Sequence, residues 1–370
     1  MRRILTIICI CLFSMSINAQ PPRGENLYVG TFTSEGAEGV YWLRFNPETG
    51  DLKPFQIMKG IDNPNFMKKS PDGQRMYIVG RSPGAVDATG GFVSSYQIGA
   101  RGELKFLGKQ TSHGGDPCYI DVSPDGKWAA LANYGGGSIA IYPVGDNGAL
   151  LPATSVIRHQ GSGPNLARQK EPHAHSIRFS RDGSMLYAAD LGTDQILIYR
   201  LDKSNGTLTP GSQPFVAMPP GSGPRHFEFT KDEKFAYVAN ELTSTVTVIE
   251  ANGNQLQAVQ TISSLPDDFK GVSYCADIHL SPDEKYVYVS NRGHQSIAVF
   301  ERTADSKLRL IKHVGVEGDW PRNFTIHESG KFMLVANQRS HNVTVFELKD
   351  GIPVFTGNQL AVPAAVCLQF

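Results

Sequence analysis

Arginine, histidine and glutamate residues recur in this sequence at the edges of short apolar segments. His175 closes the motif PHAH and Arg225 lies in GPRH, each directly before an apolar run. Glu241 and Arg292 each follow an asparagine that ends such a run. Guanidinium groups bind carboxylate or phosphate through paired hydrogen bonds, and an imidazole or a carboxylate beside them can transfer protons. If the fold brings these four residues together, they predict proton-transfer chemistry on a bound anionic small molecule.

Further polar residues occupy the same two kinds of position and are candidates for binding the substrate. They are His173, His226, Arg322, Asn133, Tyr134, Asn65 and Asn337. Asparagine at the end of a strand also serves as a turn cap, and His226 could be a hydrogen-bonded structural residue, so both interpretations stay open. Arg225, Glu241 and Arg292 could likewise form a purely structural ion-pair network.

The sequence carries no strong signal for a metal or a cofactor. His173 and His175 lie two residues apart, on one face of an expected strand, but no third ligand follows at a spacing typical of zinc. G-x-S-x-G, H-E-x-x-H, P-loop and dinucleotide-binding motifs are all absent from the sequence. We therefore predict no metal and no cofactor, which leaves activation of water or proton transfer on a small molecule.

The elements that must position these residues are short strands in a repeated unit. One unit reads apolar strand, Ser-Pro-Asp-Gly, apolar strand ending in Ala-Asn, as in YIDVSPDGKWAALAN from Tyr119. Asp-Gly between two alternating apolar runs indicates a tight hairpin. A third strand follows seven times, each time with a more polar fourth segment. Four strands recurring at a spacing of roughly fifty residues predict the blades of a β-propeller.

The two chain ends predict how the ring closes. Residues 26–32 resemble the second strand of a unit, so the first copy lacks its opening strand. The missing strand is found at residues 363–370, PAAVCLQF, which resemble the first strand at 117–122. We predict an all-β, seven-bladed propeller of four antiparallel strands per blade over residues 24–370. Its C-terminal strand joins the N-terminal blade, which removes exposed strand edges.

Propeller geometry converts these positions into one location. First strands line the central channel, and first and second strands are antiparallel, so the start of one lies beside the end of the other. His175, Arg225 and Arg322 precede or open first strands, whereas Glu241 and Arg292 follow second strands. We expect all five at one mouth of the channel, where a propeller has its natural concavity.

Composition and the N-terminus restrict the partners and the compartment. There are 35 Lys+Arg and 35 Asp+Glu, so the formal net charge is zero, and we predict no nucleic-acid partner. Arg2 and Arg3 precede an apolar run, and the small residue Ala19 suits a cleavage site. We predict a signal peptide at residues 1–19, hence an exported, periplasmic protein, and no later membrane span. The sequence carries no signal for an oligomeric state.

Once the predicted signal peptide is removed, the cysteines that remain are Cys118, Cys275 and Cys367. They are too far apart for a disulfide framework, so we expect small buried apolar side chains.

Taken together, these segments resemble the propeller-type lactonases, the group of bacterial 6-phosphogluconolactonase and fungal carboxymuconate lactonising enzyme. The likeness covers the chain after the signal peptide and rests on LYVGTFT, the SPDG…LAN units, PHAH, GPRH and VCLQF. By this resemblance, the family's site histidine falls on His175, its arginines on Arg225 and Arg292, and its glutamate on Glu241.

The resemblance implies a carboxylic ester hydrolase that opens a sugar δ-lactone with activated water. We expect the anionic substituent to bind Arg225 and Arg292, and Glu241 or His175 to take the proton from water. Because 6-phosphogluconolactone is a cytoplasmic metabolite and this chain carries a predicted export signal, an unphosphorylated aldonolactone is also a candidate substrate. Two alternatives stay open: a muconate-type lactonising cycloisomerase and a non-enzymatic ligand-binding propeller.

Overall fold

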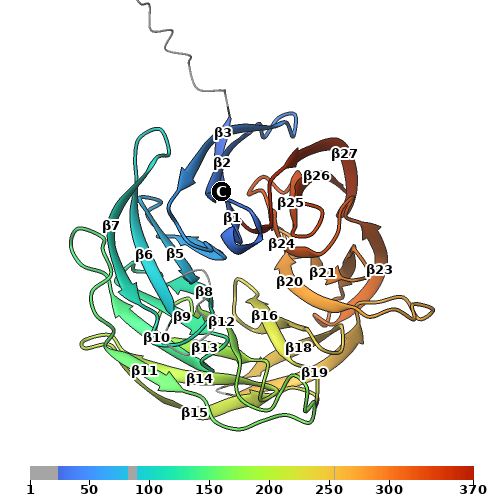
Figure 1. Cartoon of the computed structure of the whole chain (residues 1–370). Coiled ribbons are helices and arrows are strands. Elements are labelled where there is room, and N and C mark those ends of the chain that lie inside the picture. The colour runs from blue at the N-terminus through green and yellow to red at the C-terminus, as the bar shows by residue number, and fades with distance from the viewer. Residues whose placement is uncertain (1–23, 82–89, 254) are drawn as a thin grey trace, which may run out of the picture.

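Seven sheets of four antiparallel strands surround a central axis in the computed structural model of this chain (Figure 1). The structure describes residues 24–81, 90–253 and 255–370. The predicted signal peptide lies outside these residues. The all-β, seven-bladed propeller predicted from the repeats is confirmed.

The blades follow one another in chain order around the ring. Blade 1 contains β28 (Ala365–Gln369), β1 (Glu25–Thr31), β2 (Gly39–Phe45) and β3 (Leu52–Lys59), with the short 3-10 helix η1 (Thr33–Glu35) after β1. Blade 2 contains β4 (Phe66–Lys69), β5 (Arg75–Arg81), β6 (Gly91–Ile98) and β7 (Leu104–Thr111). Blade 3 contains β8 (Pro117–Val122), β9 (Trp128–Asn133), β10 (Ser138–Pro143) and β11 (Ser155–Arg158).

The remaining four blades repeat the same order. Blade 4 contains β12 (Ala174–Phe179), β13 (Met185–Asp190), β14 (Gln195–Asp202) and β15 (Thr207–Ala217). Blade 5 contains β16 (Pro224–Phe229), β17 (Phe235–Asn240), β18 (Thr245–Asn252) and β19 (Gln255–Ser263). Blade 6 contains β20 (Tyr274–Leu280), β21 (Tyr286–Arg292), β22 (Ser296–Arg302) and β23 (Leu308–Gly315). Blade 7 contains β24 (Pro321–Ile326), β25 (Phe332–Asn337), β26 (Asn342–Lys349) and β27 (Ile352–Ala361).

The Ser-x-Asp turns between first and second strands explain why the repeated sequence folds into hairpins. In blade 3 the Ser123 hydroxyl donates to Asp125 at 2.6 Å and accepts from the Trp128 amide at 3.0 Å. Gly126, which follows Asp125, has a φ of 70°, which glycine adopts without steric cost. The same Ser–Asp contact recurs between Ser180 and Asp182 in blade 4. These bonds are local, so the turn is specified by the sequence of the turn itself.

Buried tyrosines tie neighbouring blades together. The Tyr77 hydroxyl in blade 2 donates to the Gly148 carbonyl of blade 3 at 3.1 Å. Tyr237 in blade 5 reaches Ser306 of blade 6 in the same way, at 2.9 Å. Because each hydroxyl satisfies a carbonyl in the next blade, the ring is braced by hydrogen bonds as well as by apolar packing.

The ring closes as predicted, because the C-terminal strand β28 pairs with β1 in antiparallel register, with Val29 opposite Leu368. The Phe32 amide continues this contact by donating to the Ala364 carbonyl at 3.2 Å. Closure gives the central channel a fixed diameter, so residues on different blades face one another at defined distances. Within the described residues, no helix is long and apolar enough to cross a membrane.

Candidate active site

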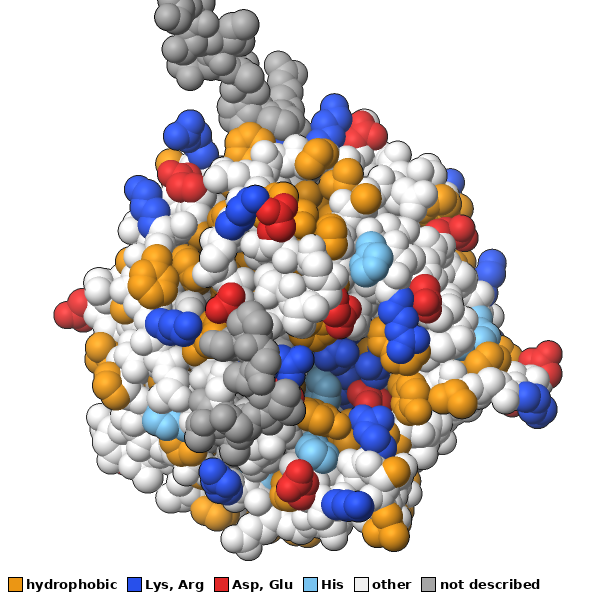
Figure 2. Space-filling model, in the orientation of Figure 1, with side chains coloured by type: hydrophobic (Ala, Val, Ile, Leu, Met, Phe, Trp, Pro, Cys, Tyr) orange, Lys and Arg blue, Asp and Glu red, His pale blue; other side chains and the backbone are white. Residues whose placement is uncertain are grey.

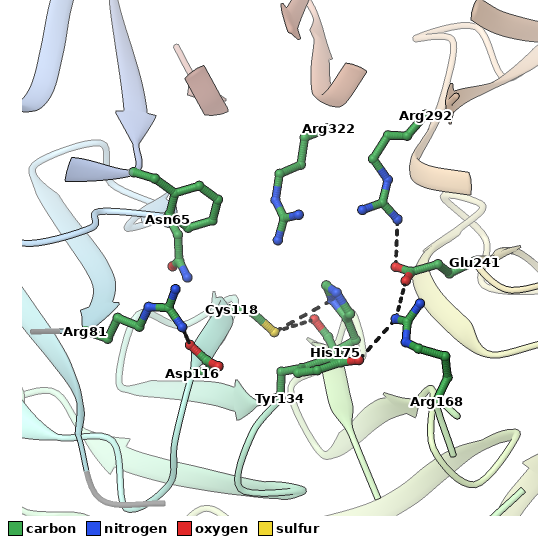
Figure 3. Close-up of a pocket in the computed structure, with 11 residues that line it drawn as sticks. Asn65, Arg81, Asp116, Cys118, Tyr134, Arg168, His175, Glu241, Arg292 and Arg322 are labelled. Carbon is green, nitrogen blue, oxygen red and sulfur yellow. Dashed lines mark hydrogen bonds and ion pairs between the residues drawn. The ribbon is translucent and has the colours of Figure 1, made fainter. Parts of the chain in front are cut away.

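A cavity of about 230 Å³ opens at one mouth of the central channel. Figure 2 shows basic and histidine side chains gathered in this hollow near the centre of one face. Residues from every blade contribute to its wall, and all but Arg168 lie near the starts of first strands or the ends of second strands. His175, Glu241, Arg292 and Arg322 are among them (Figure 3). The fold thus brings together residues that are far apart in the sequence.

Glu241 is the centre of an arginine cluster. Its Oε2 lies 3.0 Å from Arg225 Nε and 2.7 Å from an Arg292 terminal nitrogen. Its Oε1 lies 2.7 Å from Arg168. Burial by itself would raise the pKa of Glu241, but Arg292 and Arg225 hold it well below the usual value. Glu241 is therefore an anion at neutral pH and a weak base.

Arg225 lies behind Glu241 and is only 2% exposed. Its guanidinium donates to Glu241, to the Ala276 carbonyl and towards His226 Nε2, the last at 3.2 Å. Burial, reinforced by Arg292, lowers the pKa of Arg225 to about 9. These partners point Arg225 away from the main cavity, so it braces Glu241 and does not present its charge directly to a ligand there.

His175 is buried and faces the cavity. Its Nδ1 lies 3.7 Å from Cys118 Sγ, and its ring makes a T-shaped contact with the Tyr134 ring, with centres 5.4 Å apart. Burial, together with the neighbouring Arg225, lowers the pKa of His175 well below 6.5. Burial also raises the pKa of Cys118 to about 12, so the thiol stays protonated. His175 is therefore a neutral imidazole at neutral pH and can accept a proton.

Arg322 is the cavity cation with the fewest partners. Among the described residues it forms no ion pair, and its guanidinium lies 5.3 Å from the centre of the Phe32 ring. Burial and the charge of Arg292 lower the pKa of Arg322 to about 10, which still leaves it charged at neutral pH. In Figure 3 its side chain points to the centre of the cavity, facing His175. A guanidinium placed in this way attracts negative charge on a bound ligand.

The same seven-bladed architecture occurs in known proteins. A family model described as "Lactonase, 7-bladed beta-propeller" matches residues 26–370. The chain belongs to this lactonase family. The resemblance inferred from the sequence motifs is thereby confirmed.

Three named relatives are similar over most of the chain. The 6-phosphogluconolactonase of Bacillus subtilis is 35% identical over 350 residues, which cover 93% of this chain and 97% of the relative. The 6-phosphogluconolactonase of Formosa agariphila is 33% identical over 86% of this chain and 91% of its own. The structure of the periplasmic gluconolactonase of Pseudomonas aeruginosa matches with a TM-score of 0.87 and 33% identity, covering 93% of this chain and 98% of that one.

Three charged residues of this lactonase-family site were not among the sequence candidates. Arg81 and Asp116 form an ion pair on the cavity wall, at the kind of strand-edge position that the repeats already indicated. Arg168 lies in the segment 159–172, which has no strand pattern. The repeat therefore offered a signal for Arg81 and Asp116 but none for Arg168.

Four of the seven predicted substrate-binding residues lie at the cavity or beside it, and Arg322, described above, is one of them. Asn65 and Tyr134 are on its wall, and the Asn65 amide also donates to the Pro117 carbonyl at 2.9 Å. His226 lines a small adjoining cavity, and its Nδ1 lies 2.7 Å from Asp277 Oδ1. Burial and Arg225 lower the pKa of His226 to about 4, so it is neutral.

The other three lie outside the main cavity wall. His173 stacks on the Tyr134 ring with centres 4.5 Å apart, and its Nδ1 lies 3.0 Å from the Tyr134 carbonyl. The buried amide of Asn133 donates to the Ser112 carbonyl at 2.9 Å. The amide of Asn337 donates to Thr344 Oγ1 at 3.2 Å. For Asn133 and Asn337 the structure thus corresponds to the turn-fixing alternative, because their amide donors are already used within the fold.

A second, partly buried ionic cluster lies on the first strands β16 and β20. His279 Nδ1 lies 3.2 Å from Glu228 Oε2, and its Nε2 lies 3.1 Å from Asp277 Oδ2. Although burial lowers the pKa of His279, Asp277 and Glu228 raise it to about 10. Since Asp277 also binds His226, which contacts Arg225, this cluster is linked by hydrogen bonds to the cavity.

Replacing His279 by Gln should destabilise the protein in a pH-dependent way. Because the folded pKa of His279 exceeds its unfolded value of 6.5, its stabilisation is complete below pH 6.5 and is lost as the pH rises towards 10. Because the His279 side chain is partly exposed, we expect His279→Gln to lower the free energy of unfolding by about 1–2 kcal/mol at pH 6, and by clearly less at pH 10. Urea unfolding of both proteins at the two pH values measures this, and a pH-independent difference would contradict it.

Proposed function

We propose that this protein hydrolyses a sugar δ-lactone to the open-chain acid, and that it favours a lactone with an anionic substituent such as 6-phosphogluconolactone. The observation that carries the proposal is the charge of the cavity. Its wall holds four guanidiniums, from Arg81, Arg168, Arg292 and Arg322, against the two carboxylates of Asp116 and Glu241. A surplus of two positive charges beside a neutral imidazole suits a doubly charged phosphate attached to a hydrolysable ester.

In the proposed reaction, His175 is the general base. It takes one proton from a water molecule whose oxygen bonds to the lactone carbonyl carbon, and the carbonyl oxygen becomes an oxyanion. Arg322, across the cavity, stabilises that oxyanion. The bond from the carbonyl carbon to the ring oxygen then breaks, and the ring oxygen takes the proton from the His175 imidazolium. The product acid ionises and releases its proton to solvent.

Glu241 has a supporting role in this scheme. Its charge favours the imidazolium form of His175, since Glu241 acts to raise the histidine pKa against the effects of burial and Arg225. Its carboxylate is occupied by three guanidiniums and has little basicity left for water. Of the two residues considered from sequence, His175 is therefore our proposed base.

The relatives support hydrolysis over the two alternatives. Both 6-phosphogluconolactonases and the periplasmic gluconolactonase carry names of lactone hydrolases. Neither the cycloisomerase nor the non-enzymatic binding propeller gains support from them. We also propose export through a signal peptide at residues 1–19, followed by a single propeller domain from residue 24, and the periplasmic relative agrees with that location.

A lactone panel tests the proposed function directly. The purified protein would be offered 6-phosphogluconolactone, glucono-δ-lactone and a carboxymuconolactone, with acid release followed in a pH-stat. We expect acid release above the spontaneous rate for the gluconolactones and faster turnover of the phosphorylated one. Failure to accelerate the hydrolysis of any lactone would reject the proposal, and formation of a lactone from a muconate would favour the cycloisomerase.

Replacing Arg322 by Gln should remove the oxyanion partner. Loss of one such donor typically lowers kcat by about 10²- to 10³-fold, and we expect an effect in this range on every hydrolysed lactone. Arg339→Gln is the matched control, because Arg339 is exposed and stacks on Trp320 outside the cavity wall. An Arg322→Gln enzyme with unchanged kcat would assign the oxyanion to another group.

A further inference from the structure

Arg168 differs from the other arginines that contact Glu241. It comes from the irregular segment 159–172 between β11 and β12, whereas Arg225 and Arg292 belong to blade strands. Its side chain is 34% exposed, against 2% for Arg225 and 6% for Arg292. In Figure 3, dashed lines join its guanidinium to Glu241 and to the Tyr134 hydroxyl. It is therefore the member of the cluster most accessible to an incoming ligand.

The segment that carries Arg168 is held in place from inside. The next residue, Gln169, is fully buried. Its side-chain nitrogen donates to the Leu191 carbonyl and to Asp194 Oδ1, both at 2.8 Å. Its side-chain oxygen accepts from the Asn165 amide at 3.1 Å. A buried amide with these bonds anchors the segment to blade 4, so Arg168 is presented at a defined place.

The two oxygens of Glu241 are bound unequally. Oε2 is held by the two buried guanidiniums of Arg225 and Arg292. Oε1 contacts Arg168, whose same nitrogen also lies 3.2 Å from the Tyr134 hydroxyl oxygen. If Arg168 leaves Glu241 for a ligand, the two buried ion pairs of Glu241 remain intact. If Arg225 or Arg292 left Glu241, a buried guanidinium would lose its counter-charge. Arg168 is thus the cation that can change partners at low cost.

We propose that Arg168 is the residue that selects lactones with an anionic substituent, by exchanging its contact with Glu241 Oε1 for that substituent. This inference rests on the proposed function, because it names the substrate class of the same site. A guanidinium donates through several N–H groups in one plane, so it can bind phosphate or carboxylate oxygens bidentately. The partly exposed position of Arg168 and its anchored segment both suit a group that binds a ligand without any refolding of the site.

The exchange also connects recognition to turnover. When Arg168 turns to the substituent, Glu241 keeps two cationic partners instead of three. Its remaining negative charge then acts more strongly on the imidazolium that forms at His175. An anionic lactone should therefore have a higher kcat as well as a lower KM than a neutral one. A residue that merely maintained the fold would not produce this difference between substrates.

Arg168→Gln tests the proposal. We expect the ratio of kcat/KM for 6-phosphogluconolactone to kcat/KM for glucono-δ-lactone to fall about 10- to 100-fold, as for a lost hydrogen bond to a charged group. Lys170→Gln is the matched control, because it removes the same charge from the same segment at an exposed position. Equal losses on both lactones, or the same selectivity loss in Lys170→Gln, would overturn the assignment.

A second variant separates the side chain from its support. Gln169→Leu removes the buried anchor but keeps the arginine at position 168. Because Arg168 then loses its fixed position, we expect the preference for the phosphorylated lactone to fall, as in Arg168→Gln. If selectivity is unchanged although thermal unfolding shows a folded protein, the anchored segment does not present Arg168 to the substrate.

Calorimetry with 6-phosphogluconate and gluconate keeps the inference separate from the proposed function. We expect tighter binding of 6-phosphogluconate to the unaltered protein and loss of that preference in Arg168→Gln. If the unaltered protein hydrolyses no lactone but shows this binding pattern, the proposed function fails and the anion-selecting role of Arg168 stands. If it hydrolyses lactones and Arg168→Gln retains the binding preference, only the role of Arg168 fails.

Discussion

Replacing His175 by Asn should lower kcat for lactone hydrolysis by about 10²- to 10⁴-fold, the usual contribution of a general base. KM should change little, because Arg322 and the other cavity arginines remain. Asn keeps a polar side chain beside Cys118 and Tyr134 and is smaller than His, so it fits the same space without a clash. Steady-state kinetics on glucono-δ-lactone, corrected for spontaneous hydrolysis, measures the effect.

The pH profile of the unaltered enzyme provides a second measure of His175. The base form is the neutral imidazole, and burial with Arg225 holds its pKa well below 6.5. Activity should therefore stay constant as the pH falls through 6.5 and decline only at lower pH, where the imidazole gains a proton. The decline should be absent from the residual activity of His175→Asn. A decline in activity centred at pH 6.5 or above, or a decline that persists in His175→Asn, would exclude His175 as the base.

Replacing Glu241 by Gln should have the largest combined effect on activity and stability. The change removes the anion shared by three guanidiniums, two of which are buried. Removal of one partner from a buried ion pair typically costs about 3–5 kcal/mol in free energy of unfolding. We expect a loss of this size and a fall in kcat of about 10²-fold or more, because the imidazolium at His175 loses its counter-charge.

Two comparisons make the Glu241 prediction specific. Glu250→Gln, at an exposed position on the same blade, should change neither stability nor kcat measurably. In Glu241→Gln the acid limb of the pH profile should move to still lower pH, because Glu241 acts to raise the pKa of His175. A folded Glu241→Gln enzyme with full activity would remove Glu241 from the mechanism, and an upward shift of the limb would contradict its electrostatic role.

The fold could be predicted from the sequence because its determinants are local. Each hairpin turn is specified by residues in direct succession, such as Ser123, Asp125 and Gly126, and each strand by alternation of apolar residues. Repetition of these local signals gave the number of blades, and the likeness of residues 363–370 to a first strand gave the closure with β1. The strand-edge positions of His175, Glu241, Arg292 and Arg322 then followed from the blade geometry.

Tertiary structure alone decided how the charges pair. Nothing in the order of residues indicates that Arg225 lies behind Glu241 while Arg322 points into the cavity. Nor does it indicate that the Asn133 side-chain amide donates to the Ser112 carbonyl. Arg168 is the clearest case, because it lies outside the repeat and meets a carboxylate 73 residues away. Strand and turn formation depend on neighbours along the chain. The choice of ionic partner depends on side-chain directions and distances of a few ångströms between blades, which exist only once the ring has closed.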